Sequence, residues 1–219
     1  MKEARTFVVL MGDLVRSEGA ADVAALHRAF NEVVAKHNRR YATDLASPLT
    51  ITLGDEFQGL LTSLVAGAKV LHDIRLELLQ RAIDCRFVLG LAELATPVNA
   101  QQAWNMMGPG LSRARHKLNE KPELSRYGFS LPQEPLLETA LEALGVGLTL
   151  IERGWSQRQL SDMAALLAGQ APTALAAQRR VSVQNIYKIR ASAHFDAYVH
   201  QWHAMLEVLA ALDERGRGQ

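Results

Sequence analysis

The first 130 residues alternate between strand-like and helix-like patterns of apolar positions. A continuous apolar run over 7–11 predicts a buried strand that ends at Asp13. Apolar residues at helical spacing follow over 23–34, with charges on the other face, which predicts an amphipathic helix. Two short apolar runs on either side of Gly54-Asp55 predict a β-hairpin, with Gly54 supplying the positive φ that a two-residue type II′ turn needs.

The alternation continues to residue 130. Helical spacing returns over 64–79, residues 84–94 have a strand pattern, and the segment 108–120, which begins Gly-Pro-Gly, predicts a turn followed by a helix. Residues 126–130 predict a last strand. The order strand, helix, hairpin, helix, strand, helix, strand indicates an α+β sandwich with helices on one face of a largely antiparallel sheet.

A cluster of three prolines, at positions 122, 132 and 135, precedes a change of pattern. Beyond it the strand signals stop and the chain becomes rich in Ala, Leu and Gln. We therefore predict two domains, an α+β domain over 1–132 and an all-α domain over 133–219.

The composition is that of a folded protein and excludes few classes of function. The chain has 219 residues, of which 48% are hydrophobic, and a formal net charge of +1, which argues neither for nor against nucleic acid. The single cysteine, Cys85, excludes an internal disulfide framework and indicates a reducing compartment. Because the apolar run near the N-terminus is too short for a signal peptide or a membrane span, we expect a cytoplasmic protein with no membrane partner.

Two acidic residues carry the candidate chemistry of the first domain. Asp13 ends the first strand and Asp55 lies at the hairpin tip, so their carboxylates converge if the strands are neighbours. Two carboxylates a few ångströms apart repel unless a proton or cation lies between them, and Mg²⁺ is commonly held by one or two carboxylates plus substrate phosphates. Ser17, before the first helix, is placed to help bind a phosphate at the helix N-terminus. The alternative is structural, because an Asp at a strand end and a Gly-Asp turn are both common.

These motifs resemble known families. The stretches LTITLGDEFQGLL and FVVLMGDLVRS resemble the hairpin and first metal-binding strand of class III nucleotide cyclases and diguanylate cyclases, and RFVLGLAEL with MMGPGLSRARHKL resembles their later strand and helix. The residues GDLVRS and TLGDEFQG, at about these positions, resemble the SatD family most closely. The resemblance covers roughly residues 1–130 and implies a ferredoxin-like, palm-type fold. It further implies that Asp13 and Asp55 hold Mg²⁺ or Mn²⁺ and that Ser17 and Gly54 lie at the phosphates of a nucleotide.

The chain departs from these enzymes at catalytic positions. The diguanylate cyclase signature has a second glycine where Leu53 stands, and the Asn and Arg of class III cyclases align with Ser112 and His116. Loss of one charge-stabilising donor can cost about 10²–10³ in rate, so the cation site is retained while the catalytic set is incomplete. Arg113 and Arg115 either bind the nucleotide phosphates or form a solvated helix face.

The segment 155–193 resembles the helix-turn-helix of sigma-factor region four and of LuxR-type regulators, with Arg180 at the position where these motifs usually have glycine. Residues 163–195 contain four Lys or Arg and no Asp or Glu, which indicates a local basic patch. On this interpretation the DNA contacts come from outward side chains of the second helix, namely Ser182, Gln184, Asn185, Lys188 and Arg190. The alternative is a helical bundle with a solvated face.

The last helix carries a wide apolar stripe over 195–212, which predicts either the core of the second domain or a homodimer seam. The leading hypothesis is a two-domain regulator that binds a nucleotide and a divalent cation in the first domain and DNA in the second. The competing hypothesis is a Mg²⁺-dependent nucleotidyl cyclase or a related phosphoryl-transfer enzyme. A third possibility is a structural hairpin in a domain that only mediates dimerisation.

Overall fold

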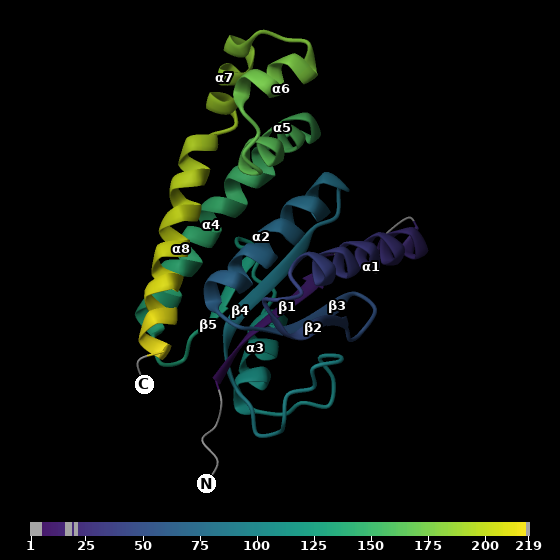
Figure 1. The fold of residues 1–219 in the computed structure, drawn as a ribbon, viewed down its shortest axis with the longest axis vertical. Helices are drawn as coiled ribbons and strands as arrows, with labels where there is room; N and C mark the ends of the chain where they lie inside the picture. The colour runs from purple at the N-terminus through teal and green to yellow at the C-terminus, as the bar shows by residue number, and fades with distance from the viewer. Residues whose placement is uncertain (1–5, 16–18, 20–21, 218–219) are drawn as a thin grey trace.

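A computed structural model describes residues 6–15, 19 and 22–217 of the chain. The described residues form an α+β structure with one five-stranded sheet in the order β2-β3-β1-β4-β5 (Figure 1). The strands are β1 (Thr6–Leu14), β2 (Leu45–Ile51), β3 (Glu56–Leu61), β4 (Cys85–Glu93) and β5 (Tyr127–Ser130). The central strand β1 is antiparallel to β3 and β4, and the edge strand β5 is parallel to β4. The predicted order of elements up to β5 is therefore confirmed.

Helices cover both faces of the sheet. Helices α1 (Val23–Arg40) and α2 (Leu64–Gln80) pack on one face, where Leu10, Phe30 and Phe57 belong to the main apolar cluster. Helix α3 (Pro109–Asn119) packs on the other face in a second cluster. The prediction that helices lie on one face only is wrong, because alternate residues of β1 and β4 are apolar on both sides and α3 buries the second side.

The predicted hairpin joins β2 to β3, and Gly54 has a positive φ of 79° as expected. Its loop is longer than the predicted two residues. The last backbone hydrogen bond runs from Thr52 N to Glu56 O at 2.9 Å, so Leu53, Gly54 and Asp55 all lie in the loop. The type II′ turn is therefore not what the structure has, although the left-handed position still falls on glycine.

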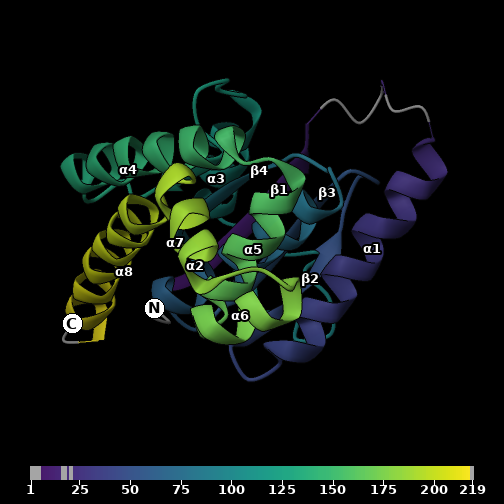
Figure 2. The ribbon, with the colours of Figure 1, turned by 90° about the horizontal axis from the view of Figure 1, so that it is seen from above.

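The C-terminal part of the chain is helical throughout. Its helices are α4 (Pro135–Gly154), α5 (Gln157–Leu167), α6 (Pro172–Arg179), α7 (Val183–Ser192) and α8 (Phe195–Arg217). The long helices α4 and α8 lie side by side, and α5, α6 and α7 gather at one end of this pair (Figures 1 and 2). Helix α4 contacts β5, and α8 contacts α2.

The main apolar cluster runs without interruption from the sheet into these helices. It joins Phe87 of β4 and Ile74 of α2 to Leu148 of α4 and to Tyr198 and Leu209 of α8. A helical domain with its own large core is therefore not shown, and the division at residue 132 stays a prediction. Among the helices of the described residues, none is long and apolar enough to cross a membrane.

Candidate functional site

Three charged side chains form a row at one end of the three central strands of the sheet. Asp13, near the end of β1, lies opposite Glu56 of β3 and opposite Arg86 of β4. Strand alternation places all three on the face that carries Val9 and Met11, which is the face covered by α3. The register of the three strands thus sets one carboxylate between a second carboxylate and a guanidinium.

Asp13 is buried, with 5% of its surface exposed. Burial raises the pKa of this carboxyl group to about 6, against the lowering effect of Arg86 and Lys121, while Asp55 and Glu56 raise it further. Its Oδ2 lies 3.1 Å from Arg86 Nε, but both atoms are buried without a well-aligned hydrogen bond. The Asp13 carboxylate is therefore only partly compensated by the protein groups around it.

The hairpin loop brings Asp55 to the same end of β1. The carbonyl oxygen of Asp55 accepts a hydrogen bond from Leu14 N at 3.0 Å, so the loop is fixed beside the residue that follows Asp13. The effect of Asp55 on the pKa of Asp13 is a second sign of their proximity. The hairpin therefore lies beside β1 as expected, while the convergence of the two carboxylates stays a prediction.

The cationic residues predicted on α3 lie in different places. Arg115 reaches back to the sheet, where its Nη1 is 2.8 Å from Glu56 Oε2 and its Nη2 donates to Gln58 Oε1 at 2.9 Å. Arg113 instead lines a shallow groove between α3 and the start of α4, together with Ser112 and His116. The predicted phosphate-binding residue Ser17 falls outside the described residues.

The oxygen atoms around Asp13 are the candidate ligands for a divalent cation. No group of three or more His, Cys, Asp or Glu side chains in the described ranges is placed to hold a metal on its own. The buried Asp13 Oδ2, which lacks a hydrogen bond, is a suitable hard oxygen ligand, and Asp55 lies nearby. The Asp13 carboxylate thus suits Mg²⁺ or Mn²⁺, which would take most of its other ligands from phosphate oxygens and water, with Asp55 as a second candidate carboxylate.

Sequence reasoning assigned no role to Arg86 or Glu56. Glu56 follows the hairpin loop, and the register of β1 and β3 places it directly opposite Asp13. For Arg86 a signal was present, because it is a single cation at an otherwise apolar strand position between Cys85 and Phe87. Its partner Asp13 could be found only from the pairing of β1 with β4.

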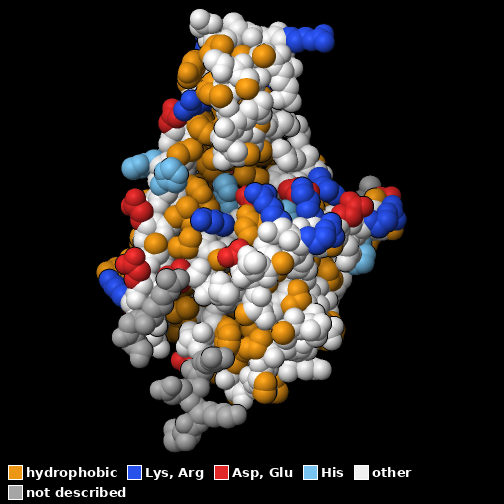
Figure 3. Space-filling view, in the orientation of Figure 1, with side chains coloured by type: hydrophobic (Ala, Val, Ile, Leu, Met, Phe, Trp, Pro, Cys, Tyr) orange, Lys and Arg blue, Asp and Glu red, His pale blue; other side chains and the backbone are white. Residues whose placement is uncertain are grey.

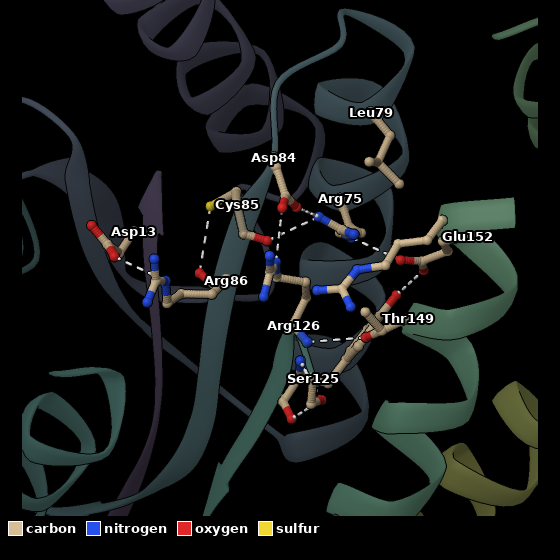
Figure 4. Close-up of polar contacts among 12 residues, drawn as sticks. Asp13, Arg75, Leu79, Asp84, Cys85, Arg86, Ser125, Arg126, Thr149 and Glu152 are labelled. Carbon is tan, nitrogen blue, oxygen red and sulfur yellow. Dashed lines mark hydrogen bonds and ion pairs between the residues drawn. The ribbon is translucent and has the colours of Figure 1, made fainter. Parts of the chain in front are cut away.

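A buried polar network connects the start of β4 to the helices (Figure 4). Asp84 accepts from Arg75 Nη1 at 2.6 Å and from Arg126 Nε at 2.9 Å. Arg75 Nε also donates to Glu152 Oε2 at 2.9 Å, and Glu152 lies on α4. Tyr198 of α8 donates to Glu152 Oε1 at 2.9 Å. The strand that carries Arg86 is thereby tied to both long C-terminal helices.

Helices α6 and α7 are joined by a short turn in which Arg180 has φ 55°, the left-handed conformation usual for glycine. Two of the four cations counted in the sequence are paired. Arg179 lies 3.4 Å from Asp162, and Arg190 lies 2.5 Å from Asp196, just outside the counted segment. The local charge is therefore lower than the sequence count indicates.

The candidate DNA-binding residues are placed on α7 as follows. The side chain of Ser182 accepts from Asn185 N at 3.2 Å and caps the helix. Gln184, Asn185 and Lys188 are exposed.

Comparison with solved structures finds nucleotide cyclase domains. A bacterial light-regulated adenylyl cyclase has 12% identity and a TM-score of 0.43, covering 57% of this chain and 74% of its own. The adenylyl cyclase CyaB from P. aeruginosa has 11% identity and a TM-score of 0.40, with coverage of 52% and 71%. The guanylyl cyclase domain of the RhoGC fusion protein from Blastocladiella emersonii has 13% identity and a TM-score of 0.40, with coverage of 54% and 75%. Likeness at this level carries no conclusion about activity. No curated protein matches the chain.

A family model gives the firmer result. The model of the SatD family matches residues 7–193, which is most of the chain. The matched range includes Asp13, Glu56 and Arg86, the hairpin and helices α1 to α7. The chain therefore belongs to the SatD family.

Proposed function

We propose that this chain is a divalent-cation-dependent enzyme that acts on a nucleoside triphosphate by phosphoryl or nucleotidyl transfer. The observation that supports this proposal is the partly compensated, buried carboxylate of Asp13, with Asp55 of the hairpin loop beside it. A carboxylate that has lost water without gaining full hydrogen bonding gains most from a cation. When bound, Mg²⁺ or Mn²⁺ would neutralise phosphate charge and polarise the reacting group.

The residues around Asp13 have separable tasks in this proposal. The central strand holds the Asp13 carboxylate in one position, because β1 is paired on both sides. Arg115 pairs with Glu56 at 2.8 Å, so we assign no cation-binding role to Glu56. Arg86 offsets the like charges in the row and offers further donors to phosphate oxygens.

Turnover with each of the common nucleoside triphosphates tests the proposal. The purified chain is incubated with Mg²⁺ or Mn²⁺, and products are identified by mass spectrometry. We expect Asp55→Asn and Asp13→Asn to lower turnover by about 10²-fold or more, because charge stabilisation by a metal is worth several kcal/mol. Glu207→Gln, an exposed acid on α8, is the matched control and should have no effect. Absence of any product, or equal turnover in Asp55→Asn, contradicts the proposal.

DNA binding by α6 and α7 is a second candidate function. It is favoured by the left-handed turn at Arg180 and by the exposed Gln184, Asn185 and Lys188, but neither the family match nor the structural neighbours support it. On the face drawn in Figure 3, charges of both signs gather across the middle of the molecule, and the end formed by α5–α7 is mostly uncharged.

Anisotropy of labelled DNA tests this second function. If α6 and α7 bind DNA, the binding should weaken steeply as salt rises. Lys188→Ala should also reduce the binding. If wild type and Lys188→Ala bind DNA equally weakly at low salt, DNA binding is excluded.

A further inference from the structure

A cavity of about 610 Å³ opens beside Asp13, where β1 ends and β4 begins. Four cationic side chains from separate parts of the chain line it. Arg86 comes from β4, Lys121 and Arg126 from the segment between α3 and β5, and Arg153 from the last turn of α4. Residues more than sixty positions apart in the sequence thus direct positive charge to one space.

The two acidic residues of the wall neutralise only part of this charge. Asp84 is already shared between Arg75 and Arg126. Glu123 meets Arg153 through its backbone carbonyl oxygen rather than through its carboxylate. Within the described part of the chain, Lys121 has no carboxylate oxygen at ion-pair distance, although it is near enough to influence Asp13. The cavity is therefore suited to an anion.

An apolar groove of about 340 Å³ continues from this cavity along α3, β5 and α4. The two spaces share Arg86, Pro122 and Arg126. The groove wall includes the apolar side chains Val88, Leu118, Leu124, Ala143 and Val146. The volumes of the cationic cavity and the apolar groove are in the range of small-molecule sites. Together they match a ligand that has phosphate groups at one end and a flat base at the other.

We propose that this joined space is the nucleotide site, with the phosphate groups bound by Arg86, Lys121 and Arg153 and the base in the apolar groove. The inference takes the identity of its ligand from the proposed function and deepens it. Arg86 connects the two, because its Nε lies 3.1 Å from Asp13 Oδ2 while the side chain also lines the cavity. Phosphates bound there adjoin the carboxylates assigned to the cation.

Arg126 has a positioning role in this site. Its guanidinium donates to Asp84 Oδ2 and to the carbonyl oxygens of Pro122 and Glu123. These bonds fix the segment that carries Lys121 against the start of β4. Arg153 adds a bond from α4 to the carbonyl oxygen of Glu123, so the C-terminal helices take part in shaping the cavity.

In EDTA, anion binding at this site can be measured without the cation that Asp13 and Asp55 are proposed to hold. The full-length chain is titrated in EDTA with tripolyphosphate and with ATP and GTP, and heat of binding is recorded. Tripolyphosphate should bind the wild type. Lys121→Gln and Arg153→Gln should each weaken it by about ten- to a hundredfold, the effect of losing one hydrogen bond to a charged group. Arg153→Lys keeps the charge and should retain most of the binding.

Matched controls remove the same charges elsewhere. Lys69→Gln and Arg158→Gln change exposed cations outside the cavity and should bind tripolyphosphate as the wild type does. Ala143→Trp, at an exposed position of the groove wall, should weaken the preferred nucleoside triphosphate while tripolyphosphate binding is unchanged.

The outcomes distinguish this inference from the proposed function. If tripolyphosphate does not bind in EDTA, or if the cavity and control variants bind it equally, the anion site is overturned. If Ala143→Trp leaves nucleotide binding unchanged, the position of the base is overturned. Binding that follows the predictions here, together with a failed turnover experiment, would reject the enzyme and keep the site.

Discussion

Asp13 illustrates how a single residue becomes a candidate ligand. Its carboxylate gains from Arg86 but loses more through burial, so its pKa rises to about 6. The group is still largely ionised at neutral pH, and it bears the cost of lost water without full hydrogen bonding. The sequence indicated Asp13 because it follows the apolar run of the first predicted strand, but the sequence alone could not reveal the burial and the neighbours that give the residue its chemistry.

His72 is a second residue whose charge state is controlled by burial. It lies on α2, stacked on Trp202 of α8 at 4.2 Å between ring centroids, with Nε2 3.0 Å from Tyr198 Oη. Because the hydroxyl group of Tyr198 donates its hydrogen bond to Glu152, Nε2 of His72 donates a hydrogen bond to the Tyr198 oxygen. Burial lowers the pKa of His72 to about 4.

The lowered pKa predicts an acid-sensitive contact between α2 and α8. Between pH 6.5 and about 4 the unfolded chain binds a proton at His72 that the folded chain does not. Acidification over this range therefore favours the unfolded chain and lowers the free energy of unfolding. The full loss is about 3 kcal/mol. In His72→Gln that loss is absent, so the free energy of unfolding of the variant should rise relative to wild type on acidification. Denaturant titrations at pH 7 and pH 4 measure the difference.

Comparison with a variant is needed because Asp13 acts in the opposite direction. Because the pKa of Asp13 is higher in the folded than in the unfolded chain, its protonation stabilises the fold. This stabilisation is complete below the pKa of the unfolded chain and is lost as pH rises through about 6. His203→Gln, at an exposed position of α8, is the control and should follow the wild type. A constant difference between His72→Gln and wild type across this pH range would show that His72 is not held neutral.

At the scale of elements, α3 is placed by a close approach to β4. A Cβ added at Gly110 would lie 2.3 Å from the Cα of Ala92, a backbone atom that cannot give way. The glycine therefore lets the helix approach the strand and bring Arg115 over Glu56. The Gly-Pro-Gly start of this helix was recognisable in the sequence, and its packing reason was not.

We expect Gly110→Ala to push α3 away from the sheet. Overpacking of this kind costs about 1–3 kcal/mol, and the free energy of unfolding should fall by that amount. Gly154→Ala is the matched control, because a Cβ at Gly154 meets nothing within 4 Å. Equal stability of the two variants in chemical denaturation would contradict the close packing of α3.

The elements were predictable to the extent that their patterns are local. The first strand, the hairpin at Gly54 and the helix that begins at Pro109 all follow from short-range apolar spacing and turn residues. The position of α3 on the second face, and the parallel pairing of β5, depend on contacts between distant segments. Arg153 illustrates the same limit, because nothing in its own segment connects it to a cavity beside β1.

At the scale of the molecule, the C-terminal helices complete the core of the sheet region. Helix α2 is buried on nearly all sides, because the sheet covers one side of it and α8 and α5 contact it as well. The ion pair of Arg75 with Glu152, both fully buried, crosses the same boundary. The proline cluster marks where the C-terminal helices begin in the sequence, but the contacts between these helices and the sheet region cross that position.

A fragment of residues 1–132 should therefore fail to fold stably. It would leave Arg75 without Glu152, a loss that costs about 3–5 kcal/mol for a buried pair, and it would expose the apolar surface of α2 that α8 covers. Thermal unfolding followed by circular dichroism, with the full chain as reference, measures this. A cooperative transition in the fragment near that of the full chain would instead support two independent domains.

The central claim is that Asp13 and Asp55 hold a divalent cation together with the phosphates of a nucleotide. Equilibrium dialysis of each common nucleoside triphosphate, with Mn²⁺ and with EDTA, tests it most directly. The account predicts that the wild type and Glu207→Gln retain more of the preferred nucleotide in Mn²⁺ than in EDTA. In Asp55→Asn, whose loop position spares the core, this increment should vanish while the binding in EDTA remains. Retention that is equal in Mn²⁺ and EDTA, or an increment that persists in Asp55→Asn, would contradict the account.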